Sequence, residues 1–238
     1  MHTVAPLTNV ALCRELAGRL ATRRPHLPGI GVMHGPAGLG KSSAAVYAAN
    51  EHDAYYIELA QIWGRKDFLA QLARLVGART RGTAATLEMA IVEALAIEPR
   101  MVLIDEADHA FARGYEDSIR NIQKKTGVPI ILIGEEALPM AVNRNERLAG
   151  MVLTWAPAQA ATADDAEVLA RLYAPQVRMS RDLTDRIASE GGGRIRRICV
   201  GIDAVRDWAE AEGLDAVDTD AWGNRPFWDV APARVRRI

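Results

Sequence analysis

Gly35, Gly40, Lys41 and Ser42 have the residue types and the spacing of a phosphate-binding loop, in the stretch GPAGLGKS. Backbone N–H groups of such a turn point at one place and bind phosphate oxygens, and glycines let the backbone come close. We expect Lys41 to reach the β- and γ-phosphates of ATP, and Ser42 to hold Mg²⁺. The predicted nucleotide-binding residues are Gly35, Pro36, Ala37, Gly38, Leu39, Gly40, Lys41, Ser42 and Ser43, joined by Asp105 and Arg196 from later in the chain.

A second motif, MVLIDEAD, places Asp105 and Glu106 at the end of an apolar stretch. In an open parallel sheet, ligands bind at the carboxyl ends of the strands. Asp105 is therefore expected to hold Mg²⁺, directly or through water, and Glu106 to polarise the attacking water. The letters DEADH superficially match a helicase box. A helicase of that class needs two α/β domains, and this chain has room for one, so we reject that interpretation.

Three further residues are candidates to complete a catalytic site. Glu135 follows the apolar stretch IILIG and is placed to touch the γ-phosphate or the water, although an amide or a hydroxyl is more usual there. Arg147, in preference to Arg144, is placed to act on a neighbouring subunit's γ-phosphate as an arginine finger; a solvated helix face is the alternative. Arg196, in EGGGRIRRICV, is expected to fold back on the nucleotide, with a surface patch or a DNA contact as the alternative.

The elements that must position these residues alternate between strands and helices. Apolar runs predict strands at 30–34, 54–59, 100–108, 128–134 and 151–155. Helical spacing predicts helices at 7–21, 41–51, 65–77, 83–98, 115–127, 162–173, 180–190 and 194–212. Thr8 or Asn9 is the expected N-cap of the first helix, and a threonine caps the helix at 83–98.

This order predicts an α/β fold: a parallel sheet flanked by helices, followed by a small α-helical domain. We expect an N-terminal helix and linker at 1–29, the α/β domain at 30–158, the helical domain at 159–212 and a C-terminal tail at 213–238. The basic end of that tail (Arg234, Arg236, Arg237) is either a DNA or transposase contact or a disordered segment.

The composition of the 238 residues is that of a soluble globular protein, with 49% hydrophobic and 25% charged residues. The net charge of −1 excludes a polycation, so nucleic-acid binding would need a local patch or an assembled surface. Cys13 and Cys199 lack metal-ligand spacing and are expected to be thiols in a reducing compartment. Without an apolar run of membrane-spanning length or a signal-peptide pattern, we expect a cytoplasmic protein, in a bacterial cell or a phage-infected host, with no membrane partner.

These motifs, in this order, resemble the AAA+ ATPases over about residues 8–212. The phosphate-loop motif corresponds to Walker A, and the acidic motif corresponds to Walker B. GRIR stands where that family has its sensor 2, in a helical lid domain. The run MVLIDEADHAF…SIRNIQKKTGVPIILIGEEAL looks most like the transposition ATPases of the phage Mu B, TniB and TnsC type. ExeA-type secretion ATPases share much of that run.

The resemblance implies a Mg²⁺-dependent ATPase that assembles on double-stranded DNA as an ATP-dependent ring or helical filament. It also implies delivery of target DNA to a transposase and activation of that enzyme. Mu B itself has an N-terminal helix-turn-helix domain, and fewer than 30 residues precede the phosphate-loop strand here. DNA binding is therefore expected to rest on the AAA+ core. The predicted phosphate contacts are Arg65, Lys66, Arg79 and Arg81, with ordinary surface charge as the alternative.

Two other functions compete with this one. The first is a nucleotide-gated interaction module with little turnover, such as an ExeA-like secretion or signalling ATPase; the unusual Glu135 favours it. The second is a helicase loader or replication initiator, for which the sequence shows neither an origin-reading domain nor a loader segment.

Overall fold

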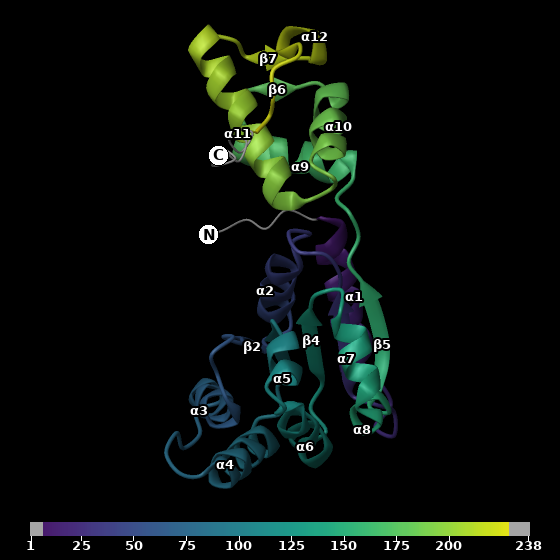
Figure 1. Ribbon diagram of the computed structural model, residues 1–238, viewed down its shortest axis with the longest axis vertical. Coiled ribbons are helices and arrows are strands. Elements are labelled where there is room, and N and C mark those ends of the chain that lie inside the picture. Colours follow the sequence, from purple (N-terminus) through teal and green to yellow (C-terminus); the bar gives the residue numbers. More distant parts are fainter. Residues whose placement is uncertain (1–6, 229–238) are drawn as a thin grey trace, which may run out of the picture. The chain divides into compact units, whose positions relative to one another are not determined.

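The computed structural model describes residues 7–228 and divides them into two compact units (Figure 1). One unit comprises residues 9–159 and holds both nucleotide-binding motifs. The other comprises residues 160–228 together with Leu7 and Thr8.

The first unit is built on one five-stranded sheet. Its strands are β1 (Ile30–His34), β2 (Tyr55–Glu58), β3 (Val102–Asp105), β4 (Ile130–Gly134) and β5 (Val152–Pro157). They pair in the order β2-β3-β4-β1-β5, and every neighbouring pair is parallel. The predicted α/β fold with a parallel sheet is confirmed. The order inserts β4 between the strand that leads into the phosphate loop and the strand that ends in Asp105.

Eight helices connect these strands or precede them: α1 (Thr8–Ala21), α2 (Lys41–Glu51), α3 (Arg65–Leu75), α4 (Ala84–Ile97), α5 (Asp108–Ala112), α6 (Glu116–Thr126), α7 (Leu138–Arg144) and α8 (Glu146–Ala149). The expected threonine cap of α4 is present, since Thr83 Oγ1 accepts a hydrogen bond from Thr86 N at 3.2 Å. Gly127, with φ of 70°, ends α6 in the left-handed conformation that glycine adopts easily. The short helices α5, α7 and α8 were not predicted from the sequence.

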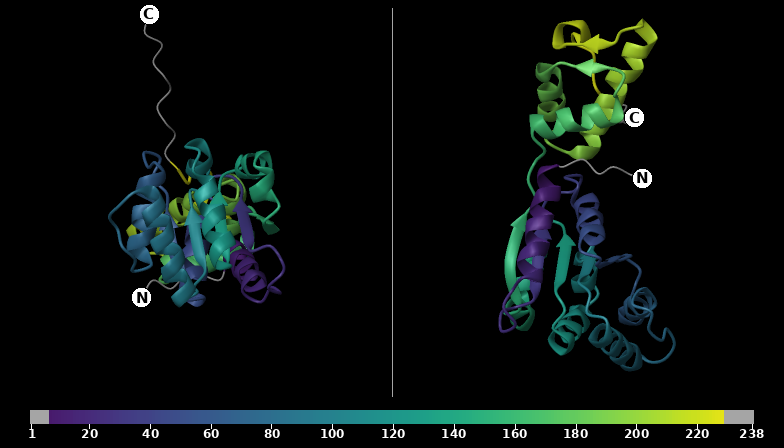
Figure 2. Two further views of the ribbon diagram at one scale, coloured as in Figure 1. Left: turned by 90° about the horizontal axis from the view of Figure 1, so that it is seen from below. Right: turned by 180° about the vertical axis from the view of Figure 1, so that it is seen from behind.

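The main core lies on one face of the sheet. Alternate residues of the strands, such as Val32, Ile104 and Leu132, join apolar residues of α3, α4, α6 and α7 in one buried cluster. On the other face, α1 packs so closely on β1 that a Cβ at Gly31 would lie 2.7 Å from Leu20 Cδ1. From behind, α1 lies across the β1–β5 side of the sheet (Figure 2). The two faces of the sheet are therefore both covered by helices, as uninterrupted apolar strands require.

The second unit is mainly helical: α9 (Ala163–Tyr173), α10 (Arg181–Glu190), α11 (Ile195–Glu212) and α12 (Thr219–Trp222). Two short parallel strands, β6 (Arg178–Met179) and β7 (Ala216–Val217), pair with each other. The stretch 213–228, expected to belong to a tail, packs on this unit: Trp222 and Phe227 are buried and stack at 5.3 Å between ring centroids. The basic residues Arg234, Arg236 and Arg237 lie outside the described residues.

No helix among residues 7–228 combines the length and the apolar character needed to cross a membrane. Both cysteines are free thiols; Cys13 is buried and Cys199 is half-buried. Burial, with a smaller contribution from the charge of Asp105, raises the pKa of the Cys13 thiol to about 12. Such a thiol stays protonated and unreactive near neutral pH.

Candidate nucleotide-binding site

The phosphate loop has the backbone that its glycines predict. Gly35, Gly38 and Gly40 all have positive φ, of 148°, 85° and 85°. Gly40 is the N-cap of α2 and makes no side-chain cap bond, so the first-turn N–H groups of the helix remain available to an anion. A side chain at Gly35 would also press on Ala158, whose Cβ lies 3.1 Å from the position of the added carbon.

Lys41 is folded over this loop. Its Nζ donates to the carbonyl oxygens of Gly35 at 2.7 Å and Pro36 at 2.9 Å. The ammonium is therefore held within the concave turn where phosphate oxygens would bind. Ser42 and Ser43, in the first turn of α2, are exposed, and Leu39 is buried beneath the loop.

Asn9, from α1, supports the loop from behind. Its Nδ2 donates to the carbonyl of Leu39 at 2.8 Å and to that of Gln159 at 2.8 Å, and its Oδ1 accepts from Gln159 N at 2.9 Å. The expectation that Thr8 or Asn9 caps α1 needs correction. The Asn9 side chain bonds to these distant residues, and Thr8 Oγ1 donates to the carboxylate of Asp165. The sequence could not show this because the partners are about 30 and 150 residues away.

Asp105 is 2% exposed at the carboxyl end of β3, and both of its oxygens are hydrogen-bonded. Oδ1 accepts from the backbone N of Glu106 at 2.9 Å, and Oδ2 accepts from the Tyr56 hydroxyl at 2.8 Å. Tyr56 lies on β2, the neighbouring strand. A buried carboxylate needs such partners, so Tyr56 belongs to the site although the sequence analysis missed it. The only signal was its position near the end of a strand next to the acidic one.

Glu106 has a strained backbone, with φ of +53°, which residues other than glycine rarely adopt. A conformation of this kind costs about 1–3 kcal/mol and is typical of functional sites. Burial and then the charge of Asp105 raise the pKa of the Glu106 carboxyl above its ordinary value. The raised pKa makes the carboxylate a better proton acceptor.

Asp108 fixes the loop that follows β4. Its Oδ2 accepts from the backbone N of Glu135 at 2.7 Å. A Cβ at Gly134 would lie 2.0 Å from that same oxygen, so the contact requires glycine there. The Glu135 side chain itself is exposed. Asp108 and Gly134 therefore determine where the backbone of Glu135 stands.

The parallel register brings these residues to one edge of the sheet. Glu58 pairs with Asp105, and His34 pairs with Gly134, so the phosphate loop, the acidic pair and Glu135 all follow carboxyl ends of strands. Residues 7–228 contain no group of three or more His, Cys, Asp or Glu side chains suited to a metal ion. Mg²⁺ in nucleotide sites needs only one or two protein oxygens besides phosphates and waters, and Ser42 and Asp105 fit that requirement.

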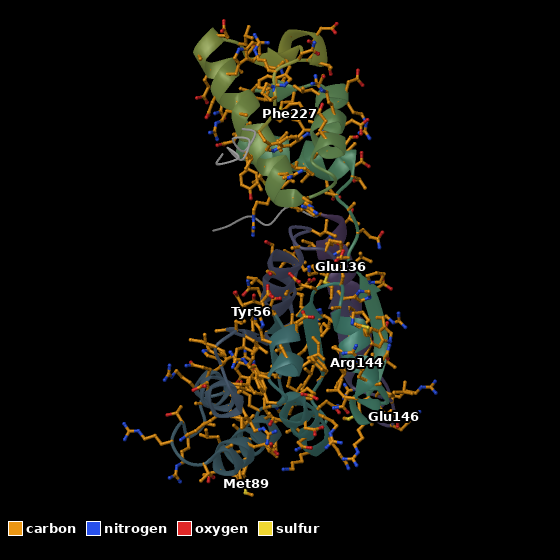
Figure 3. The ribbon with its side chains drawn as sticks, viewed as in Figure 1. Tyr56, Met89, Glu136, Arg144, Glu146 and Phe227 are labelled. Carbon is orange, nitrogen blue, oxygen red and sulfur yellow. The ribbon has the colours of Figure 1, made fainter. Side chains whose placement is uncertain are left out.

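Arg144 and Arg147 lie elsewhere. Arg147 is in α8, which leads into the amino end of β5, and both arginines are exposed. In Figure 3, Glu136, which follows β4, lies toward one end of the strands, and Glu146, the first residue of α8, toward the other. The six residues of β5 span about 17–20 Å at roughly 3.3 Å per residue. Arg147 is thus not brought together with its own phosphate loop.

Arg196 belongs to the helical unit. Gly192 and Gly193, with φ of 61° and 63°, turn the chain into α11, and Gly193 O accepts from Ala161 N at 2.9 Å. Arg196 is exposed in the first turn of that helix, between Arg194 and Arg197.

The four predicted DNA-contact residues are exposed on the α/β unit: Arg65, Lys66, Arg79 and Arg81. Arg65 Nη2 donates to the Gly114 carbonyl at 3.2 Å, and Arg113 Nε donates to the Gln61 carbonyl at 3.0 Å. These bonds connect the segment after β2 with the segment between α5 and α6. Arg79 and Arg81 lie in the connection between α3 and α4.

Residues 23–140, about half of the chain, match the family of the AAA domain. This segment is an AAA domain. Together with the sheet order and the two motifs, the match identifies the α/β unit as a P-loop AAA+ core. No curated protein sequence matches the chain.

Solved structures share the fold of this AAA domain and its helical unit at low identity. The ORC2 protein of Aeropyrum pernix, in ADPNP–ADP complexes, aligns with a TM-score of 0.68 and 17% identity, over 92% of this chain and 68% of that one. The ORC1 protein of the same organism, in complex with DNA, gives 0.64 and 16%, over 88% and 61%. The RuvB Holliday junction branch migration motor of Thermotoga maritima gives 0.62 and 19%, over 91% and 67%. The chain thus spans about two thirds of these proteins, and the likeness concerns the fold.

Proposed function

We propose that this chain is an ATPase that binds and hydrolyses ATP with Mg²⁺. One observation carries the proposal: Lys41 follows the carboxyl end of β1, and Asp105 and the strained Glu106 follow the carboxyl end of β3, on the same side of the parallel sheet. Phosphoryl transfer to water needs little else than positioning and charge stabilisation. The AAA domain match supports a nucleotide ligand.

Each residue has a role in this hydrolysis. Backbone N–H groups of the loop and Lys41 bind the phosphates, while Ser42 and Asp105 would hold Mg²⁺, which neutralises developing charge when bound. The Glu106 carboxylate orients and polarises the attacking water. Tyr56 keeps Asp105 in place, and Asp108 keeps the Glu135 loop in place. We assign Glu135 to contact with the γ-phosphate or the water, and Arg196 to contact with the nucleotide from the helical unit.

Turnover of ATP in the presence and absence of Mg²⁺ tests this proposal. The wild type should release phosphate, and Lys41→Ala should lower both nucleotide affinity and turnover by at least about tenfold. Lys125→Ala, at an exposed lysine of α6 outside the site, is the control. A wild type that binds no nucleotide would overturn the assignment.

We further propose that the site is completed by a second copy of the chain. Arg147 lies a strand's length from its own phosphate loop, so it can reach only a nucleotide on another subunit. An arginine finger is worth about 10³–10⁵ in turnover. Arg147→Ala should therefore abolish turnover while nucleotide affinity is retained, whereas Arg144→Ala should have little effect. Unchanged turnover in Arg147→Ala would refute the finger.

Double-stranded DNA is the proposed partner of the assembled state. The four exposed cations Arg65, Lys66, Arg79 and Arg81 supply phosphate contacts without base reading, and the similar ORC1 structure is a complex with DNA. Binding to a duplex of arbitrary sequence in ATP and in ADP, with sedimentation under the same conditions, tests this. If the protein in ATP does not bind the duplex at low salt, the proposed DNA binding is wrong.

Delivery of that DNA to a transposase, with activation of the transposase, is the specific role we propose, on the resemblance to transposition ATPases. A replication initiator or loader is the second candidate, favoured by the fold shared with the ORC proteins. Selection from a random duplex library separates them. Retention without sequence enrichment supports a target-DNA protein, and enrichment of one sequence supports an initiator.

A further inference from the structure

A group of cations lines an open cavity at the amino ends of the strands. The cavity has a volume of about 650 Å³ and is lined by Arg120, Lys124, Arg147 and Met151. We call Arg120, Lys124 and Arg147 the α6–α8 cation cluster. Only Arg147 was singled out by the sequence analysis.

Secondary structure explains why the three side chains meet. Arg120 and Lys124 are four residues apart on α6, so they lie on one face of that helix. Arg147 comes from α8, and Met151 precedes β5 and pairs through its carbonyl with Ile30 N at 3.0 Å. Lys125, the next residue of α6, points elsewhere, since its Nζ pairs with Glu88 Oε1 at 3.0 Å.

The cluster has more positive charge than its surroundings neutralise. Arg120 lies 3.3 Å from Asp117 Oδ1, without the geometry of a hydrogen bond at its Nε, and its side chain is 19% exposed. Within the described part of the chain, neither Lys124 nor Arg147 is in an ion pair. Arg147 also borders a second cavity, which is lined by the carboxylates of Glu116, Asp117 and Glu146. Around the first cavity, two guanidinium groups and an ammonium group stand without a carboxylate in its lining, which favours an anion with several oxygens, such as phosphate.

The position of the cluster excludes its own nucleotide as that anion. The phosphate loop, Asp105 and Gly134 follow the carboxyl ends of the strands, whereas α6 ends just before β4 and α8 just before β5. We propose that Arg120 and Lys124 join Arg147 in binding the terminal phosphate of a nucleotide held by a second copy of this chain. This rests on the proposed ATPase function and extends it: three cations, rather than one arginine, complete the neighbouring site.

The test combines single variants with a mixing experiment. Arg120→Gln and Lys124→Gln should each lower ATP turnover by about tenfold or more and leave nucleotide affinity within about twofold of wild type. Lys125→Gln, the adjacent lysine outside the cluster, should keep wild-type turnover. Lys124 is exposed, so its variant keeps the test meaningful if Arg120→Gln folds poorly. Arg120→Lys should recover part of the turnover.

Mixing shows on which subunit the cluster acts. Glu106→Gln lacks the water-activating group but has an intact cation cluster. Lys124→Gln keeps the water-activating group but has a defective cluster. An equimolar mixture of these two impaired variants should reach about a quarter of wild-type turnover, because one random interface in four joins the two intact halves. No recovery in the mixture would overturn action on a neighbour.

Two other outcomes are equally decisive. Lys124→Gln with normal turnover and a weaker, less salt-dependent affinity for duplex DNA would assign the cluster to DNA phosphates and overturn our proposal. A wild type without any turnover would overturn the proposed function together with the cluster's role. A wild type with turnover and unaffected cluster variants would overturn the cluster alone.

Discussion

The hydroxyl of Tyr56 donates a hydrogen bond to Asp105 Oδ2 at 2.8 Å. The bond joins β2 to β3 at the edge of the sheet where the phosphate loop lies. Burial, and then the charge of Asp105, raise the pKa of the Tyr56 phenol, so it remains a donor at any physiological pH. One oxygen of the proposed magnesium ligand is thereby fixed by the protein itself.

Tyr56→Phe should disturb Asp105 without changing the fold. Loss of a donor to a buried carboxylate costs about 1–3 kcal/mol, and we expect the free energy of unfolding to fall by about that amount. The Mg²⁺ concentration for half-maximal turnover should rise several-fold. Tyr55→Phe, on the same strand, is the matched control. The Tyr55 ring lies against Arg100, with 4.3 Å between the guanidinium carbon and the ring centroid. Equal Mg²⁺ dependence in both variants would contradict this role.

Glu106→Gln should stabilise the chain near neutral pH while abolishing turnover. A carboxyl group whose pKa is raised on folding binds more protons when folded, so the free energy of unfolding falls as pH rises from the unfolded pKa, near 4.5, through the folded one. Gln removes that cost. We expect a melting temperature higher by about 2 °C at neutral pH, with the gain vanishing below about pH 4.5.

The control for that pH dependence is Glu136→Gln, at an exposed carboxyl nearby. Across this pH range, the melting temperature should differ from that of the wild type for Glu106→Gln and stay close to it for Glu136→Gln. A Glu106→Gln protein that is destabilised at neutral pH, or that hydrolyses ATP normally, would remove Glu106 from its assigned role.

Asn9→Ala should weaken both the fold and the phosphate loop. The change leaves the buried Leu39 carbonyl and the Gln159 peptide without their partner, which we expect to lower the free energy of unfolding by about 2–3 kcal/mol. Nucleotide affinity should fall several-fold. Asn50→Ala, at an exposed position of α2, should stay within about 0.5 kcal/mol. Chemical denaturation and nucleotide titration measure both effects.

Gly134→Ala and Gly18→Ala should have opposite effects. At Gly134 the new Cβ would lie 2.0 Å from Asp108 Oδ2 and 2.9 Å from Leu138 Cδ2, so we expect a loss of about 2–3 kcal/mol. At Gly18, inside α1, nothing lies within 4 Å, and Ala should stabilise by about 0.5–1 kcal/mol. Thermal melting distinguishes them. A harmless Gly134→Ala would mean that Asp108 does not hold the Glu135 loop.

Much of the α/β unit was predictable because its signals are local. Three glycines around Lys41 specify a phosphate loop, since only that backbone lets N–H groups converge. The apolar runs at 30–34 and 128–134 predicted β1 and β4 almost to the residue. Strands that are apolar on both faces required helices on both sides. The short helices α7 and α8 were not predicted, because a few residues show too little helical periodicity.

Long-range contacts could not be predicted from the sequence, for a different reason. A polar residue such as Asn9 at the start of a helix satisfies the N-cap rule, and nothing beside it in the sequence indicates that its partner is Gln159. Likewise, Trp222 and Phe227 have no helical or strand period, yet their stacking buries both in the helical unit. Only the folded chain specifies such partners.

By itself, then, the sequence determined the nucleotide-binding chemistry, because the residue types and backbone freedom of GPAGLGKS and DEAD lie within a few consecutive positions. The tertiary structure decided how those positions are supported and completed. The order of five parallel strands brings Tyr56 to Asp105, and it separates Arg147 from its own loop while placing it beside Arg120 and Lys124. Strand order and helix packing arise from burial of apolar surface over the whole unit, which no single motif encodes.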